Sequence, residues 1–427
     1  MSEAILFRGG EVIDETGTRR ADVLVSDGVV GDVGESLEPP AGVTVLDVDG
    51  CVVSPGLVDL HAHLREPGDP EAETVVTGSR AAALGGYTAV VAMPNTDPPI
   101  DNVAVVEQVR QLARGALCHV EVSAAITVGR AGERLAPLGE LADAGVRLFT
   151  DDGTGVQDPG LMRRALEYAR PLGITLAQHC EDLALAGGGH MHEGEWSSRL
   201  GIPGVPALAE EAMVSRDLAL AAVARGRLHL LHLSTARSVE LVRAARAAGV
   251  AVTCEVSPHH LMLTDEEVGS YDPAFKVNPP LRPADDVVAL RDAVADGTID
   301  AIATDHAPHP PQAKQAPFDQ APPGMLGLET ALAVALTVLE MPVDAVLAAL
   351  SWKPARIAGL ADHGRRVAPG EPANLCVIDP AEAWSVDPMA LASAARNTPF
   401  AGRKLTGRVR HTVFRGELVV SDGEARR

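Results

Sequence analysis

The most informative part of the chain is Asp59-Leu60-His61-Ala62-His63-Leu64-Arg65, which directly follows an apolar run at residues 51–58. Because side chains alternate along a β-strand, His61 and His63 point to the same side. Two imidazoles on one face at the end of a strand can chelate a single metal ion. A lone His-X-His pair is weak evidence, since two unrelated polar residues at a strand exit would look the same.

Other polar residues stand at the ends of similar apolar runs, and this recurrence predicts the fold. His179, His232 and Asp305 each end another strand-like run, and Asp151-Asp152 end a further one. We expect strands at residues 52–61, 88–93, 119–124, 146–150, 174–179, 228–232, 250–256 and 299–304.

Helix-like segments lie between the expected strands. Residues 103–114 and 238–248 show helical spacing, the second with Ser234 or Thr235 as a possible cap. This alternation indicates an α/β protein with a (β/α)8 TIM-type barrel, and a doubly wound sheet is the alternative. The barrel is favoured because polar residues follow both the first and the last strand, and only a barrel brings those ends together.

Both ends of the chain are rich in short strands. Residues 5–10 and 21–28 near the N-terminus, and 373–378 and 412–420 near the C-terminus, have strand-like composition with Asp-Gly turns. We therefore predict a small β-sandwich domain formed by residues 1–54 and 366–427, around a metal-dependent hydrolase barrel at 55–365.

Composition excludes several classes of protein. The chain has 427 residues, of which 46% are apolar, and a formal net charge of −22, which argues against nucleic acid or an anionic membrane as a partner. The five cysteines are scattered and odd in number, so no disulfide framework is expected. From the residues we expect no signal peptide and no membrane-spanning stretch. The sequence thus predicts a soluble, cytoplasmic protein.

The polar residues at the strand ends form a candidate metal centre. Four imidazoles and two or three carboxylates exceed the roughly four ligands of one zinc ion. They suffice for two ions about 3.5–4 Å apart that share a bridging carboxylate and a bridging water. Zinc suits mixed histidine and carboxylate ligation, and manganese or cobalt would also fit.

These motifs resemble those of the amidohydrolase superfamily and, within it, the long, zinc-dependent type of bacterial dihydroorotase. The resemblance extends over residues 50–405. It is carried by His63-Leu64-Arg65-Glu66-Pro67-Gly68, Met93-Pro94-Asn95-Thr96, Thr150-Asp151-Asp152-Gly153, Lys276-Val277-Asn278-Pro279-Pro280-Leu281-Arg282, Thr304-Asp305-His306-Ala307-Pro308-His309 and Asn397-Thr398-Pro399-Phe400.

The positions of the lysines separate subfamilies. Many relatives bridge their metals with a carboxylated lysine from the fourth strand, but the only lysines here are Lys276, Lys314, Lys353 and Lys404. None precedes the seventh strand, so another group must bridge. The resemblance favours Asp152, and Asp151 is the alternative.

The resemblance implies the reversible cyclisation of N-carbamoyl-L-aspartate to L-dihydroorotate in pyrimidine biosynthesis, with a metal-bridged hydroxide and Asp305 as general base and then acid. Two Zn²⁺ ions bridged by Asp152 are expected. The implied metal ligands are His61, His63, Asp152, His179, His232 and Asp305. The implied substrate contacts are His63, Arg65, Asn95, Asn278, His309, Pro323 and Gly324.

Some of these residues have simpler interpretations. Arg65 could form a surface ion pair with Glu66, and Asn278 could be a turn residue. Among the other histidines, we expect His259-His260 to be structural, His119 and His229 to lie at the opposite end of the barrel, and His190 and His192 to be solvated. The loop at 306–324 is a candidate lid.

Two other functions stay open at this stage. One is a different cyclic amidohydrolase, such as an allantoinase or dihydropyrimidinase; the absence of the bridging lysine and the presence of Arg65 speak against it. The other is a non-catalytic subunit that only scaffolds aspartate carbamoyltransferase, which a complete ligand set disfavours. The sequence leaves open whether the chain forms a homodimer or binds aspartate carbamoyltransferase, and which metal it holds.

Overall fold

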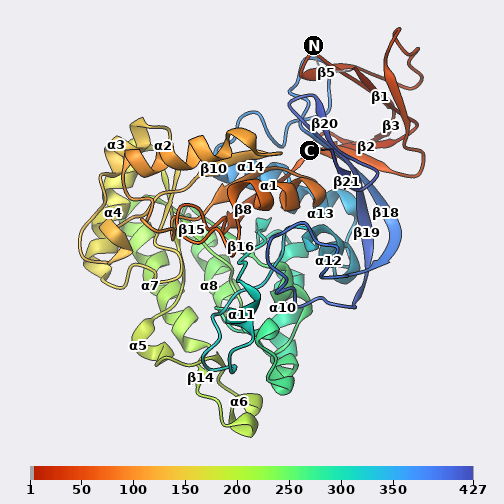
Figure 1. The fold of residues 1–427 in the computed structure, drawn as a ribbon. Coiled ribbons are helices and arrows are strands. Elements are labelled where there is room, and N and C mark those ends of the chain that lie inside the picture. Colours follow the sequence, from red (N-terminus) through yellow and green to blue (C-terminus); the bar gives the residue numbers. More distant parts are fainter. Residues whose placement is uncertain (1–3, 427) are drawn as a thin grey trace.

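The computed structural model describes residues 4–426, and its centre is a closed parallel barrel (Figure 1). One three-stranded and one five-stranded parallel sheet are joined at both edges by the bridges Ala62–His306 and Ala124–Phe149. The (β/α)8 prediction is therefore confirmed, and each of the eight predicted ranges overlaps a barrel strand. The barrel strands are β8 (Leu57–Ala62), β9 (Tyr87–Ala92), β10 (His119–Val122), β11 (Leu148–Thr150), β12 (Thr175–Gln178), β15 (Arg227–Leu230), β16 (Val252–Val256) and β17 (Ala301–Ile302).

Helices surround the barrel and bury their apolar faces against it. The main ones are α1 (Val75–Leu84), α2 (Val103–Leu112), α3 (Leu138–Asp143), α4 (Pro159–Leu172), α7 (Leu208–Ala224), α8 (Ala236–Ala247), α10 (Ala284–Ala295), α12 (Ala331–Val338), α13 (Val343–Leu350) and α14 (Trp352–Ala358). The predicted cap of α8 is Thr235, whose hydroxyl accepts a hydrogen bond from the Ser238 amide at 3.1 Å.

The region between β12 and α7 forms an excursion from the barrel. It contains α5 (Leu183–Ala186), β13 (Met191–His192), α6 (Glu195–Leu200) and β14 (Gly204–Val205). Shorter helices, α9 (Pro258–Met262) and α11 (Pro311–Lys314), lie in the loops after β16 and β17.

The two ends of the chain build the smaller β domain together (Figure 1). A four-stranded sheet contains β5 (Val29–Gly34), β4 (Asp22–Ser26), β1 (Ile5–Arg8) and β6 (Thr44–Asp47). A seven-stranded sheet combines C-terminal and N-terminal strands in the order β21 (Glu424–Ala425), β20 (Glu417–Ser421), β19 (Lys404–Phe414), β18 (Leu375–Ser385), β7 (Val52–Pro55), β2 (Glu11–Asp14) and β3 (Gly17–Arg20). Between the sheets lies a core of Val, Ile, Leu and Phe side chains. The domain boundaries between residues 54 and 55 and between residues 365 and 366 remain predictions.

The prediction of a single strand at residues 52–61 is wrong, because this stretch forms two strands that belong to different domains. β7 pairs with β18 and β2, whereas β8 pairs with β9 in the barrel. Gly56 joins them, and a Cβ atom there would lie 2.1 Å from the Thr88 side chain. Only glycine permits this close approach, and the apolar run alone gives no sign of it.

The five cysteines are buried free thiols, as expected from their scattered positions. Within residues 4–426 no helix is both long and apolar enough to cross a lipid bilayer.

Candidate metal centre

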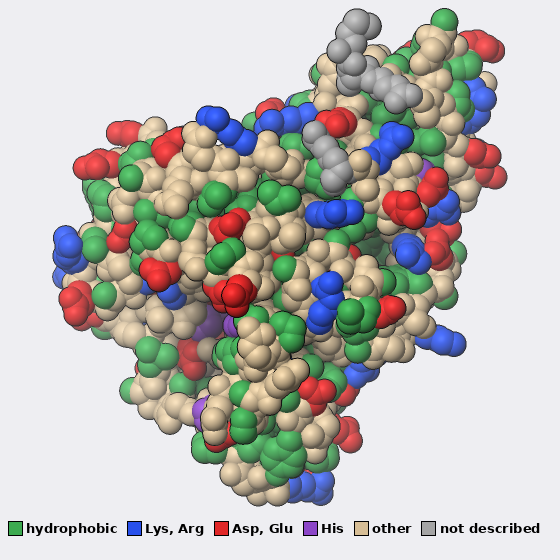
Figure 2. All heavy atoms as spheres, in the orientation of Figure 1, with side chains coloured by type: hydrophobic (Ala, Val, Ile, Leu, Met, Phe, Trp, Pro, Cys, Tyr) green, Lys and Arg blue, Asp and Glu red, His purple; other side chains and the backbone are tan. Residues whose placement is uncertain are grey.

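Two groups of three side chains, each suited to hold a metal ion, lie at the carboxyl end of the barrel. One is His61, His63 and Asp152, and the other is Asp152, His179 and His232. All five residues are buried, and they come from the ends of β8, β11, β12 and β15. Histidine side chains are visible in a recess of the molecular surface (Figure 2).

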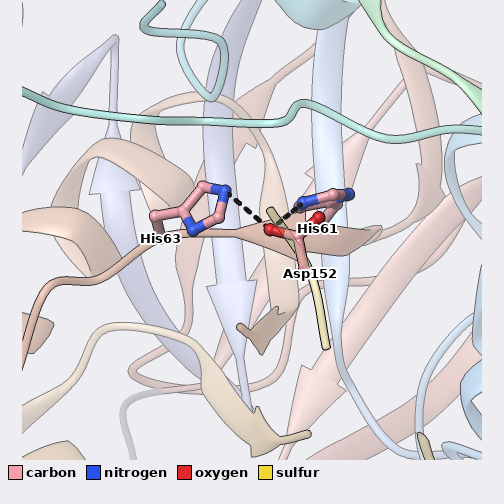
Figure 3. A group of neighbouring side chains, drawn as sticks. All are labelled: His61, His63 and Asp152. Carbon is pink, nitrogen blue, oxygen red and sulfur yellow. Dashed lines mark ion pairs between the residues drawn. The ribbon is translucent and has the colours of Figure 1, made fainter. Parts of the chain in front are cut away.

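The carboxylate of Asp152 faces both groups through different oxygen atoms. Its Oδ2 lies 3.4 Å from His61 Nε2 and 3.5 Å from His63 Nε2 (Figure 3). Its Oδ1 lies 3.5 Å from His179 Nδ1 and 3.6 Å from His232 Nε2. A carboxylate placed in this way suits two cations bound side by side.

Two polar atoms of this centre lack a hydrogen-bond partner within residues 4–426. His61 Nε2 and Asp152 Oδ1 are buried and have no hydrogen-bond partner among the described residues. A buried polar atom without a partner costs about 1–3 kcal/mol, and a bound cation would remove that cost. Burial alone would raise the pKa of Asp152, but the surrounding imidazoles hold it well below its usual range. The donor set therefore fits two divalent metal ions.

Asp305 lies beside the two groups rather than within either. Its Oδ1 is 3.3 Å from His63 Nε2 and 3.5 Å from His61 Nε2, and Asp305 lines a cavity next to the centre. Asp305 has a φ of 46°, an uncommon conformation for a residue other than glycine. The preceding Thr304 fixes it, because its amide and hydroxyl donate to buried Asp59 at 2.8 and 2.6 Å.

Three polar residues of the centre were not predicted. Glu255, the fourth of the five residues of β16, accepts from His61 Nδ1 at 2.9 Å and from His229 at 3.0 Å. Glu181 lies 3.2 Å from His179 Nε2. The sequence could have indicated a role for Glu255, because it is a charged residue in a mainly apolar predicted strand. A carboxylate buried in this way needs a hydrogen-bonding partner. The prediction that His229 begins its strand at the opposite end of the barrel is wrong, because His229 is the third residue of β15 and its side chain bonds Glu255, the partner of His61.

The predicted substrate-binding side chains line one cavity of about 190 Å³ next to the metal groups. Arg65 donates from Nε to the Pro308 carbonyl at 3.1 Å, and no ion pair with Glu66 is found within residues 4–426. Asn95 accepts from His63 Nδ1 at 2.8 Å. The lining residues are His63, Arg65, Asn95, Asp152, Gly153, His179, His232, Val277, Asn278, Asp305, Ala307, His309, Pro322, Pro323 and Gly324.

Several of these groups already have partners inside the protein. The side-chain amide of Asn278 donates to Glu181 at 2.7 Å, so it is more than a turn residue. His309 Nε2 donates to the Pro323 carbonyl at 2.8 Å, and burial with nearby Arg65 lowers the pKa of His309 to about 3. The Gly324 amide donates to a backbone carbonyl at 2.9 Å.

The loop at 306–324 is tied to the segment before Asn278 by two lysines. Lys314, in the loop, donates to the carbonyl of Pro273 at 2.9 Å. Lys276, in the opposite segment, donates to the carbonyl of Phe318 at 2.7 Å. These bonds hold the loop over the cavity in the observed position.

The sequence also led to predictions for histidines outside the metal centre. His259 and His260 are buried beside Ser257, which agrees with a structural role. The prediction that His192 is solvated is wrong, because it is 9% exposed and lies 3.0 Å from the fully buried Arg282. The Gly-rich composition around it suggested an open loop, whereas the excursion after β12 folds back onto the barrel.

Solved structures show what class of protein this fold belongs to. An L-hydantoinase (dihydropyrimidinase) from Arthrobacter aurescens has a TM-score of 0.86 and 25% sequence identity, over 100% of this chain and 97% of that chain. A dihydropyrimidinase from Brevibacillus agri reaches 0.87 at 22% identity, over 99% of this chain and 96% of that one. The fold, with two His/Asp groups that share one aspartate, defines a metal-binding hydrolase barrel of the amidohydrolase type.

Sequence relatives identify the family within this class. The "Dihydro-orotase-like" family model matches residues 50–238. A dihydroorotase of Streptomyces coelicolor is 50% identical over 98% of this chain and 99% of its own length, and one of Leifsonia xyli subsp. xyli is 50% identical over 99% and 97%. The chain therefore belongs to the dihydroorotases, a family of cyclic amide hydrolases.

Proposed function

We propose that this protein interconverts N-carbamoyl-L-aspartate and L-dihydroorotate in pyrimidine biosynthesis, at the cavity beside Asp152. The observation that carries the proposal is the joint placement of two metal-ligand groups and a cationic Arg65 around one cavity. A metal centre suits the hydrolysis of a cyclic amide, and an arginine suits a substrate that bears a carboxylate.

Arg65 and Asn95 are proposed to bind the substrate's α-carboxylate. Arg65 uses its Nε to bond Pro308, and its terminal amino groups have no hydrogen bond to any described residue. A guanidinium presents a planar fork that matches a carboxylate. Asn95 accepts from His63 through Oδ1, which leaves its amino group as a donor.

His309, Asn278 and Gly324 each already donate a hydrogen bond inside the protein. His309 donates its Nε2 proton to the Pro323 carbonyl, and the side-chain amide of Asn278 donates to Glu181. The Pro323 carbonyl keeps a second lone pair for a ring N–H of the substrate. The side-chain oxygen of Asn278 is likewise an acceptor that the substrate can use.

Asp305 is proposed to move the proton. Neighbouring imidazoles overcome the effect of burial and keep the pKa of Asp305 below its usual range, so the carboxylate is ionised and ready to accept. It takes a proton from the attacking water and returns it to the leaving ring nitrogen, acting as base and then acid. Bound metal ions would supply Lewis acidity for the carbonyl and lower the pKa of the water.

The residues proposed to hold these ions are His61, His63, Asp152, His179, His232 and Asp305. Asp152 lies between the two groups, and Asp305 lies beside them. We propose zinc as the metal, since it accepts mixed histidine and carboxylate ligands. We propose that the protein is located in the cytoplasm. Aspartate carbamoyltransferase and a second copy of this chain are its candidate protein partners.

The decisive experiment compares turnover of L-dihydroorotate with that of dihydrouracil, hydantoin and allantoin, with the metal content measured on the same sample. Preference for dihydroorotate with about two ions per chain supports the proposal. Faster hydrolysis of a neutral ring would move the function to a hydantoinase-like activity. A stable content of one ion, with full activity and no gain on adding zinc, would contradict the binuclear site.

A further inference from the structure

Buried polar side chains of β15 and β16 continue from the metal centre into the barrel interior. His61 Nδ1 lies 2.9 Å from Glu255 Oε1, and Glu255 Oε2 lies 3.0 Å from His229 Nε2. His229 Nδ1 lies 2.8 Å from the hydroxyl of Thr253. His61, Glu255 and His229 have no exposed surface.

We propose that Glu255 and His229 are positioning residues for His61. They hold its ring in place with the proton on Nδ1, so that Nε2 is available to the metal. This inference rests on the proposed metal-dependent function and extends it to two residues outside the ligand set.

The hydrogen-bonding chemistry of a carboxylate supports this assignment. An ionised carboxylate only accepts hydrogen bonds, so both ring nitrogens that face Glu255 must carry protons. With Nδ1 protonated, a neutral His61 has its lone pair on Nε2. That atom has no hydrogen-bond partner among the described residues, and it faces Asp152. The orientation of a metal-binding histidine is commonly set by a carboxylate on its other nitrogen.

His229 has a separate task, which is to fix Glu255. A buried carboxylate oxygen without a partner is costly, so Oε2 needs the proton of His229. Thr253 donates its hydroxyl proton to His229 Nδ1, which keeps the proton of that ring on Nε2. The pairing is set by the strands themselves, because His229 lies directly opposite Thr253 in the β15–β16 ladder.

Zinc affinity tests the proposal without any measurement of turnover. Metal-free Glu255→Gln protein competes for Zn²⁺ with a chromophoric chelator, and we expect binding roughly 10–100-fold weaker than in the parent. The reason is that a glutamine amide accepts on one side only and cannot receive both imidazole protons. Asp14→Asn is the matched control, since Asp14 is a buried carboxylate (2% exposed) in the small β domain, and it should keep the parental affinity.

A second pair of variants covers the case in which Glu255→Gln does not fold. His229→Ala should weaken zinc binding, whereas His229→Gln, which can still donate to Glu255, should restore most of it. At saturating zinc, kcat should fall and KM for dihydroorotate should stay near the parental value, because neither residue touches the cavity. Zinc affinity within twofold of the parent in folded Glu255→Gln, or equal affinities of His229→Ala and His229→Gln, would overturn the proposal. A protein that binds zinc as expected but does not turn over dihydroorotate would refute the proposed function alone.

Discussion

Asp151 and Asp152 are neighbours in the sequence, but their carboxylates serve different partners. Asp151 accepts hydrogen bonds from the amides of Ile126 and Thr127 at 2.8 and 3.0 Å, whereas Asp152 faces four imidazoles. One residue ties two barrel loops together, and the other belongs to both metal groups. The bridging role proposed for Asp152 follows from this division.

Exchanging each aspartate for alanine should separate the two roles. Asp152→Ala should lose bound metal together with activity. Asp151→Ala should keep more of both but lose about 1–3 kcal/mol of stability, because it leaves buried amides without an acceptor. Metal analysis and urea denaturation of both variants check this. The reverse order of metal loss would transfer the bridging role to Asp151.

Asp305→Asn should lower kcat by roughly two to four orders of magnitude, the usual contribution of general acid–base catalysis. Asparagine keeps the size of the side chain and can still bind a cation, but it cannot carry the proton. Steady-state kinetics at saturating zinc, with the metal content measured in parallel, provide the test. A variant that retains metal and near-parental kcat would remove Asp305 from the proton transfer.

Arg65→Lys should mainly raise KM for dihydroorotate and change kcat little. Lysine keeps the charge but loses the planar fork, and the carboxylate is held in the ground state and the transition state alike. The measurement is KM for dihydroorotate beside KM for dihydrouracil, which has no carboxylate. An unchanged KM for dihydroorotate would shift the substrate towards neutral cyclic amides.

Activity should not depend on carbon dioxide or bicarbonate. A carboxylated lysine bridge would need it, but no lysine precedes Lys276, and Asp152 occupies the position between the two groups. Protein prepared in carbonate-free buffer should therefore match protein supplied with bicarbonate in rate and metal content. Stimulation by bicarbonate would mean that another group bridges the metals.

Stability should fall in mild acid, in part because of His363. Burial, with His119 and Arg415 nearby, lowers the pKa of His363 to about 3, against about 6.5 in the unfolded chain. His363 therefore binds a proton in the unfolded state at pH values where it stays neutral in the folded state. The stabilisation is complete above pH 6.5 and is lost as the pH falls towards 3, by up to about 1.4 kcal/mol per pH unit.

The variant His363→Gln isolates this contribution. Its free energy of unfolding should fall less steeply than that of the parent between pH 6.5 and 4.5, as measured by urea denaturation at several pH values. Parallel slopes for the two proteins would show that His363 takes up its proton normally in the folded state.

The linear sequence was sufficient to identify the barrel and the metal-binding residue types, for a simple physical reason. Parallel strands bring their carboxyl ends to one face, so polar residues that follow successive apolar runs must meet there. His61, His179 and Asp305 could be assigned to one centre on this basis although they lie far apart in the chain. The missing lysine was equally visible, since it depends only on composition.

Only the tertiary structure decided how those residues are supported and which of two adjacent aspartates faces the centre. The directions of Asp151 and Asp152 depend on loop contacts, and the division of the run at Gly56 depends on the close approach of Thr88. The partnership of His61, Glu255 and His229 depends on strand register and on contacts across the barrel interior, because His61 and Glu255 are 194 positions apart in the chain. Local periodicity carries no information about such distances, which are set by how the strands close around a common core.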